Sequence, residues 1–141
     1  MTPEEDRQEI AAREVRFVVV VDDYESAVHL YRDVFGLNLV MDLEGQGGRG
    51  VILEVPSATL EFVDADHERM VDMLETGEPF DKRVRIAVQV GDLGEAARAV
   101  SDAGAEPVAS PVETPWGDRN QRLMTRDGLQ LTLFETEDRP D

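Results

Sequence analysis

The sequence predicts an α+β fold in which two βαβββ units form a curved mixed sheet with a shared cleft. The first observation is an internal repeat, because residues 17–31 and 86–100 both read as an apolar run, an aspartate and a helical apolar stripe. Asp23 and Asp92 are equivalent in this repeat and lie 69 residues apart. The second is that short apolar runs follow each helix and are separated by turns rich in Gly, Pro and Ser. The third is that 41% of the 141 residues are hydrophobic, which suits one core.

One domain is expected over residues 14–136, because no flexible linker or low-complexity segment divides this region. The residues before it are polar and acidic, and both ends of the chain are expected to be peripheral. The expected parts are an N-terminal arm at 1–13, a first unit at about 14–64, a connector at 65–82, a second unit at about 83–136 and a tail at 137–141.

The first unit opens with a predicted strand at 15–21, which is nearly all apolar and is therefore expected to be covered on both faces. Asp22 is the predicted N-cap of the following helix, with Glu25 as its capping-box partner. An apolar stripe runs from Tyr24 to Phe35 at helical spacing, and Gly36 ends the helix. The three strands predicted next are 38–43, 50–55 and 59–63.

The connector is predicted to contain a short helix. Met70, Val71 and Leu74 fit one side of it, and Gly77 with Pro79 would end it.

The second unit repeats the order of the first. A strand is predicted at 83–90, and Asp92 is expected to cap a helix, with Glu95 at the capping-box spacing and Gly104 at its end. The remaining predicted elements are strands at 106–109, 121–125 and 129–134, with a turn region at 110–118 and a tight turn at 126–128.

The composition excludes several classes of function. The net charge of −17, from 31 acidic and 14 basic residues, opposes nucleic-acid binding and indicates either steering of a cationic ligand or a solvated acidic surface. No cysteine is present, which excludes a disulfide scaffold, a cysteine-ligated zinc site and a thiol nucleophile. No apolar run approaches a membrane span and no signal peptide is recognised, so a cytoplasmic protein with no membrane partner is expected.

Two segments resemble one known family. VVDDYESAVHLYRDVFGLNLV at 20–40 looks like the first strand, helix and second strand of the vicinal oxygen chelate superfamily. PWGDRNQRLMTRDGLQLTLFE at 115–135 looks like its closing hairpin. The superfamily holds glyoxalase I, extradiol dioxygenases and bleomycin-resistance proteins, and the resemblance covers about residues 14–136. It implies the paired βαβββ fold but leaves the function open, because these members differ in chemistry.

The resemblance also implies where a metal would bind. The family's metal-ligand positions fall on Arg16, Glu61, Arg85 and Thr132. Only Glu61 is a good ligand, because an arginine side chain stays protonated in proteins and threonine offers a neutral hydroxyl. We therefore expect no metal and no cofactor at these positions.

The same positions are candidates for ligand binding. Arg16 and Arg85 could donate hydrogen bonds to an anionic or carbonyl-bearing ligand, with Glu61 orienting one of them and Thr132 on the same polar face. Trp116 lies in a turn and is interpreted as a ligand contact or a dimer contact. The alternatives are a structural salt-bridge cluster of Arg16, Glu61 and Arg85, or arginines at strand ends in solvent.

No catalytic residue is identified. His29 and His67 are the two histidines, and neither falls at a matching family position.

Two functions remain. The first is metal-free binding of a small organic molecule in the groove between the units, as in antibiotic resistance of the bleomycin type, by a homodimer that shares its grooves. The alternative is a metal-dependent lyase, isomerase or dioxygenase of the same superfamily with non-standard ligands. The metal content of the purified protein would discriminate between these two functions. The sequence alone does not decide whether the chain is an enzyme.

Overall fold

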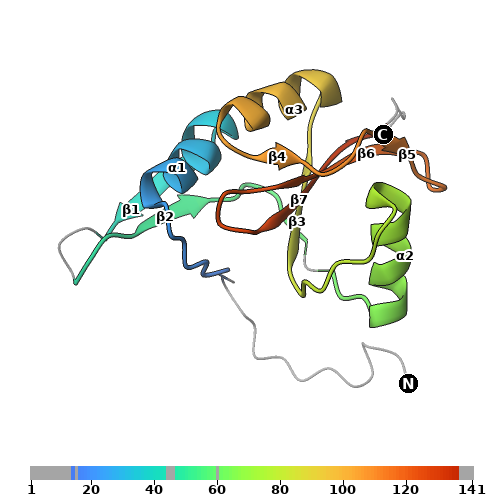
Figure 1. Cartoon of the computed structure of the whole chain (residues 1–141). Coiled ribbons are helices and arrows are strands. Elements are labelled where there is room, and N and C mark those ends of the chain that lie inside the picture. The colour runs from blue at the N-terminus through green and yellow to red at the C-terminus, as the bar shows by residue number, and fades with distance from the viewer. Residues whose placement is uncertain (1–13, 15, 44–46, 60, 137–141) are drawn as a thin grey trace.

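The second half of the chain forms a five-stranded mixed sheet (Figure 1). The computed structural model describes residues 14, 16–43, 47–59 and 61–136. In the sheet β3 runs parallel to β7, β7 is antiparallel to β6, and two short strands pair with the other side of β6. The strands are β3 (Arg85–Gln89), β4 (Glu106–Pro107), β5 (Val112–Glu113), β6 (Asp118–Met124) and β7 (Gln130–Thr136).

A tight turn sets the register of the β6–β7 hairpin. The backbone N–H of Thr125 donates to the carbonyl of Leu129 at 2.9 Å and that of Gly128 to the carbonyl of Thr125 at 3.0 Å. Arg122 then lies opposite Thr132. Alternate side chains point to opposite faces of a strand, so this register gives the hairpin one apolar and one polar face.

The helix α3 (Leu93–Asp102) covers the apolar face. As predicted, Asp92 is its N-cap, and its carboxylate accepts from the backbone N–H of Glu95 at 3.0 Å. The backbone N–H of Leu93 donates to the carboxylate of Glu135 in β7 at 2.7 Å. Val100 of the same helix and Leu93 are fully buried against three leucines of β6 and β7, which are Leu123, Leu131 and Leu133.

The first helical segment consists of α1 (Tyr24–Val28) and the π-helical turn η1 (His29–Val34). Its N-cap is Asp23, which accepts from the backbone N–H of Ser26 at 3.0 Å, so the prediction of Asp22 was one residue early. The reason is that the backbone N–H groups of Asp22 and Asp23 both donate to the carboxylate of Asp127, at 2.6 and 3.3 Å. This contact holds the chain out of the helix until Tyr24.

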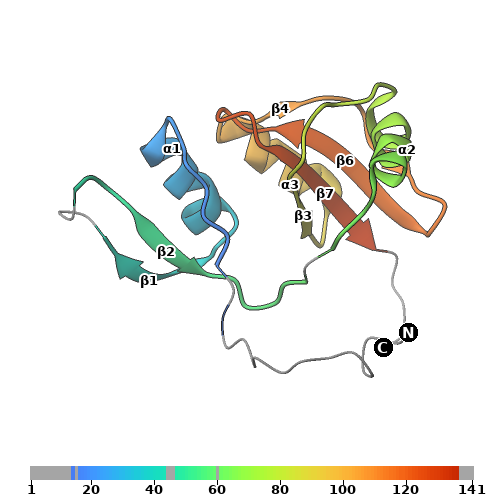
Figure 2. The same cartoon turned by 90° about the horizontal axis from the view of Figure 1, so that it is seen from below.

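In the first βαβββ unit, the described residues form two of the four predicted strands. The strands β1 (Asn38–Asp42) and β2 (Val51–Glu54) pair as a two-stranded antiparallel sheet, apart from the five-stranded one (Figure 2). The predicted strands at 15–21 and 59–63 are wrong for the residues described, since 16–21, 59 and 61–63 have no regular structure. An apolar run becomes a strand only where another edge pairs with it, and no such edge meets these residues.

The connector forms α2 (Ala65–Thr76), longer than predicted, and Gly77 ends it in the left-handed conformation at φ 80°. Its buried residues are Val71, Asp72 and Glu75 rather than the predicted stripe of Met70, Val71 and Leu74. The helix lies on the face of the sheet opposite α3 (Figure 1). None of the helices in the described ranges is long and apolar enough to cross a membrane.

Candidate functional site

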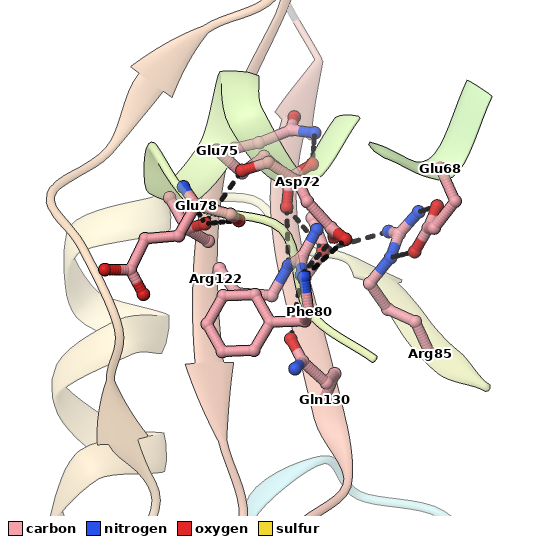
Figure 3. A network of polar contacts seen from close by, with 11 residues as sticks. Glu68, Asp72, Glu75, Glu78, Phe80, Arg85, Arg122 and Gln130 are labelled. Carbon is pink, nitrogen blue, oxygen red and sulfur yellow. Dashed lines mark hydrogen bonds and ion pairs between the residues drawn. The ribbon is translucent and has the colours of Figure 1, made fainter. Parts of the chain in front are cut away.

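The candidate site is the polar face of the five-stranded sheet, where α2 covers it (Figure 3). The side chains that alternate with the core leucines point to this face. They come from three neighbouring strands, and all but Arg85 are almost fully buried. The residues of the face used below are Arg85 of β3, Asn120 and Arg122 of β6, and Gln130 and Thr132 of β7.

Arg122 is at the centre of this face. Its side chain is only 1% exposed. Its Nε donates to Glu75 Oε1 at 2.9 Å, and its Nη1 donates to Asp72 Oδ1 at 2.9 Å. The same Nη1 donates to Gln130 Oε1 at 2.7 Å. The buried guanidinium is thus paired with two carboxylates, and both come from α2.

Arg85 forms the second ion pair with α2. Its Nε and Nη2 donate to the two oxygens of Glu68 at 3.0 and 2.9 Å, a bidentate arrangement that favours a strong charge-assisted contact. Its Nη1 donates to Thr132 Oγ1 at 3.0 Å. The side chain is 19% exposed, so this pair lies at the edge of the network.

Thr132 and Asn120 complete the surroundings of Glu75. The Thr132 hydroxyl donates to Glu75 Oε1 at 2.8 Å, and Asn120 Nδ2 donates to Glu75 Oε2 at 3.0 Å. The carboxylate therefore accepts from Arg122, Thr132 and Asn120 together, which compensates for its burial.

Three polar atoms of the face have no hydrogen-bond partner among the described residues. They are Arg122 Nη2, Gln130 Nε2 and Asn120 Oδ1, and all three are buried. Two of them are donors. A buried donor without a partner costs about 1–3 kcal/mol, so the face has hydrogen-bonding capacity that α2 does not use.

The ion pairs perturb the charged groups in the expected directions. The hydrogen bonds from Arg85 hold the pKa of Glu68 below its usual value, against the opposing effect of burial. Burial opposes the charge of Arg85, but Glu68, and more remotely Glu75 and Asp72, raise the pKa of its guanidinium. Both groups are therefore fixed in their charged forms at neutral pH.

The predicted site residues are only partly brought together. Arg85 and Thr132 are hydrogen-bonded in the polar face. Arg16 is exposed, and its guanidinium contacts Glu14 Oε1 at 3.1 Å. Glu61 is exposed, and Trp116 is 46% exposed in the turn between β5 and β6. The described ion pair of Arg85 is with Glu68, so the predicted cluster of Arg16, Glu61 and Arg85 is not found.

Several residues of the site were missed from the sequence. The alternation that placed Gln130 and Thr132 on one face could have been extended to Asn120 and Arg122, once the hairpin register was known. The spacing of the acidic residues in the connector was also a signal, because positions i, i+4 and i+7 share one face of a helix. Those residues are Glu68, Asp72 and Glu75.

The donor set does not fit a divalent metal ion. Of the positions that the resemblance equates with metal ligands, Arg85 supplies a guanidinium, Thr132 a neutral hydroxyl, and Glu61 is exposed outside the polar face. Within the part of the chain that the structure describes, no three His, Cys, Asp or Glu residues are grouped so as to hold a metal ion.

Two shallow depressions lie elsewhere on the surface. One, of about 170 Å³, is beside the β5–β6 turn and is lined by residues that include Thr114, Gly117 and Glu135. The other, of about 250 Å³, is apolar and lies where η1 and α3 meet the end of β3. Neither includes a residue of the polar face.

Residues 14–133 match the family model of the Glyoxalase/Bleomycin resistance protein/Dioxygenase superfamily. The chain belongs to this superfamily. The family name covers both enzymes and resistance proteins, so it defines the fold and leaves the chemistry to the residues of the site.

Solved structures of the same fold are similar to this chain. TnmS3, an antibiotic binding protein from Streptomyces sp. CB03234, is 21% identical with a TM-score of 0.57, over 92% of this chain and 100% of that one. A superfamily member from Sphaerobacter thermophilus DSM 20745 is 23% identical with a TM-score of 0.52, over 86% and 98%. Hypothetical protein SA1046 from S. aureus is 16% identical with a TM-score of 0.59, over 95% and 99%. No curated protein gives a significant match.

Proposed function

We propose that the protein binds a small organic molecule without a metal, as a resistance-type member of its superfamily, in the groove of paired βαβββ units. The observation that carries the proposal is the hydrogen-bonded pair of Arg85 and Thr132. The resemblance equates these two positions with metal ligands, and here they carry hydrogen-bonding groups instead. The likeness in fold to TnmS3, an antibiotic binding protein, supports a resistance role.

The proposed ligand contacts form two groups. Arg85 and Thr132 belong to the polar face, together with the neighbouring Arg122. The other group is Arg16, Glu61 and Trp116, which lie outside that face in one chain. We propose that assembly with a second chain brings this group to the groove.

We also propose a homodimer. The segment 16–21 and the residues that follow β2 expose apolar side chains, with Val18 88% and Val20 91% exposed. Such surfaces are rare on monomeric proteins and are typical of association sites. The internal repeat equates the apolar runs that precede the two helices, and the second of these runs forms β3. We therefore propose a second copy of the chain as the partner that covers the first run.

The compartment and partners follow from composition. A chain without cysteine suits a reducing compartment, so we propose that the protein acts in the cytoplasm. Its net charge of −17 disfavours a nucleic-acid partner and gives no attraction to an anionic membrane surface.

The first experiment combines elemental analysis with ligand screening. Protein purified without chelator, and again after incubation with nickel, zinc, iron or manganese, is expected to hold near-zero metal. Thermal-shift screening of aromatic and acidic antibiotics is then expected to find a ligand. About one tightly held ion per chain would contradict the metal-free proposal and favour the alternative, a metal-dependent lyase, isomerase or dioxygenase.

The site is tested by substitution. Arg85→Ala is expected to weaken an anionic ligand by about tenfold, the loss of one charge-assisted contact. Arg98→Ala removes the same charge from an exposed position of α3 and is the matched control. Unchanged affinity in the Arg85 variant would remove that residue from the site.

A further inference from the structure

The polar face of the sheet is chemically an anion-binding surface. Without α2 it would present two guanidinium groups, Arg85 and Arg122, together with the amide of Gln130 and the hydroxyl of Thr132. Arginine forks of this kind match carboxylate and phosphate groups. Without the carboxylates of α2, the charge of this face would be positive even though the whole chain carries −17.

The helix α2 supplies the anions that occupy this surface. Glu68, Asp72 and Glu75 lie at i, i+4 and i+7, and every one of them contacts a guanidinium of the face. Three carboxylates thus face two guanidinium groups. The helix therefore imitates a ligand with several acidic groups.

Apolar packing contributes little to holding α2. Val71 is the one buried hydrophobic side chain of α2 among the described residues, and no α2 residue belongs to the core cluster of α3 and the sheet. Buried ion pairs add little net stability, because removing the charges from water offsets most of their attraction. Segments without regular structure flank the helix at 61–64 and 77–84, so the connector can move without breaking a strand.

The face also keeps unused hydrogen-bonding capacity beneath α2. Arg122 Nη2 and Gln130 Nε2 are buried donors without a partner among the described residues. A ligand with more acceptor oxygens than the three carboxylates present could engage these donors as well, and α2 does not.

We propose that α2 is a displaceable cover, and that a small ligand carrying two or more carboxylate or phosphate groups competes with Glu68, Asp72 and Glu75 for Arg85 and Arg122. This inference rests on the proposed small-molecule site and adds the class of its ligand and the way in which access is controlled. Binding of such a ligand is coupled to release of the helix, so the free energy that docks α2 lowers the apparent affinity.

The test uses the full chain, with citrate and pyrophosphate as probes and acetate at equal ionic strength as the monovalent comparison. Isothermal titration calorimetry compares the wild type with Glu68→Gln, which removes the edge pair with Arg85. Asp66→Asn is the matched control, because it removes one charge from an exposed residue of the same helix. Glu68→Gln is expected to bind citrate about tenfold more tightly than the wild type, and Asp66→Asn to match the wild type.

Hydrogen exchange gives a second readout that needs no substitution. Citrate is expected to speed exchange of the α2 amides at 65–76 in the wild type and to leave α3 at 93–102 unchanged. The double variant Glu68→Gln/Arg85→Gln is expected to lose the gain in citrate affinity, which locates the anion at Arg85.

Three results would overturn the proposal. They are equal citrate affinities for Glu68→Gln and Asp66→Asn, unchanged or slower exchange of α2 in citrate, and no binding of citrate or pyrophosphate by any variant. The proposed function fails separately. If an organic antibiotic binds without opening α2, the proposed function is supported and the displaceable cover is contradicted. If citrate releases α2 while no antibiotic binds, only the displaceable cover is supported.

Discussion

At the scale of single residues, Arg122 links the sheet to the connector helix. One side chain joins Asp72 and Glu75 of α2 to Gln130 of β7, across a sequence separation of up to 50 residues. Removing the charge of one partner from a buried ion pair destabilises a protein far more than replacing the whole pair by apolar residues, since it leaves the other charges unpaired.

Arg122→Met is therefore expected to lower the free energy of unfolding by about 3–5 kcal/mol, because Asp72 and Glu75 lose their cation. Urea unfolding followed by circular dichroism measures this. Arg98→Met, at an exposed position of α3, is expected to change stability by less than about 0.5 kcal/mol. The triple variant with Asp72→Asn and Glu75→Gln should recover most of the loss, and a loss below about 1 kcal/mol in the single variant would argue against a buried network.

Tyr31 presents the opposite case, a buried hydroxyl with no partner among the described residues. Burial, with a smaller effect of Asp127, raises its pKa to about 12. Tyr31→Phe is expected to leave stability at neutral pH unchanged or to raise it by up to about 1 kcal/mol, because no hydrogen bond is lost. Urea unfolding tests this, and a clear loss would mean that the hydroxyl has a partner.

The same tyrosine makes stability depend on alkaline pH. Because its folded-state pKa lies above the usual 10.0, the folded form resists ionisation and the wild type loses stability as pH rises above about 10. The Tyr31→Phe variant should lose less stability than the wild type in this pH range. A phenolate absorbance titration of the two proteins should locate the late transition in the wild type alone.

At the scale of elements, α2 responds to acid through Glu68. The pKa of this carboxyl is lowered from 4.5 by Arg85, so its stabilising effect is complete above pH 4.5 and is lost as pH falls through the lower folded-state pKa. The free energy of unfolding of the wild type is expected to be about 1 kcal/mol higher than that of Glu68→Gln at neutral pH. Urea unfolding at several pH values should show this difference closing in acid, and a difference that is constant with pH would contradict the assignment.

How well the sequence predicted each element depended on whether its signals were local. Capping by Asp92, the helix that Gly77 ends and the tight turn at 126–128 follow from neighbouring residues, and they are confirmed. The strands predicted at 15–21 and 59–63 needed a pairing partner that sequence pattern does not supply.

The candidate site was predicted in part for the same reason. Arg85 and Thr132 were placed by the family resemblance, and they are in contact. The carboxylates of α2 were missed because their helical spacing indicates a shared face but not which surface covers it. Asp72 and Glu75 are buried under a sheet that forms later in the chain.

At the scale of the whole molecule, the two repeats differ in completeness. The second forms the five-stranded sheet and most of the core, to which the first contributes Leu30. The first leaves apolar residues of 16–21 exposed. Association with another copy would cover them, and this predicts an oligomer in solution.

Light scattering after size exclusion is expected to give twice the 15.7 kDa of one chain. Val18→Lys with Val20→Lys should shift the protein toward the monomer, because two charges are placed in the proposed interface. Met73→Lys adds a charge to the exposed side of α2 and is the control, which should remain dimeric. A monomeric wild type would contradict the homodimer.

The carboxylates that hold the two helix starts have a consequence for the order in which the chain folds. Asp127 accepts from the amides that precede α1, and Glu135 accepts from the first amide of α3, so the β6–β7 hairpin adds a contact to each helix start beyond its local N-cap. The ribosome makes this hairpin after both helices, because N-terminal parts of a chain emerge first. These two contacts cannot form until the hairpin has been made, so a nascent chain truncated before the hairpin should expose both repeats to chaperones.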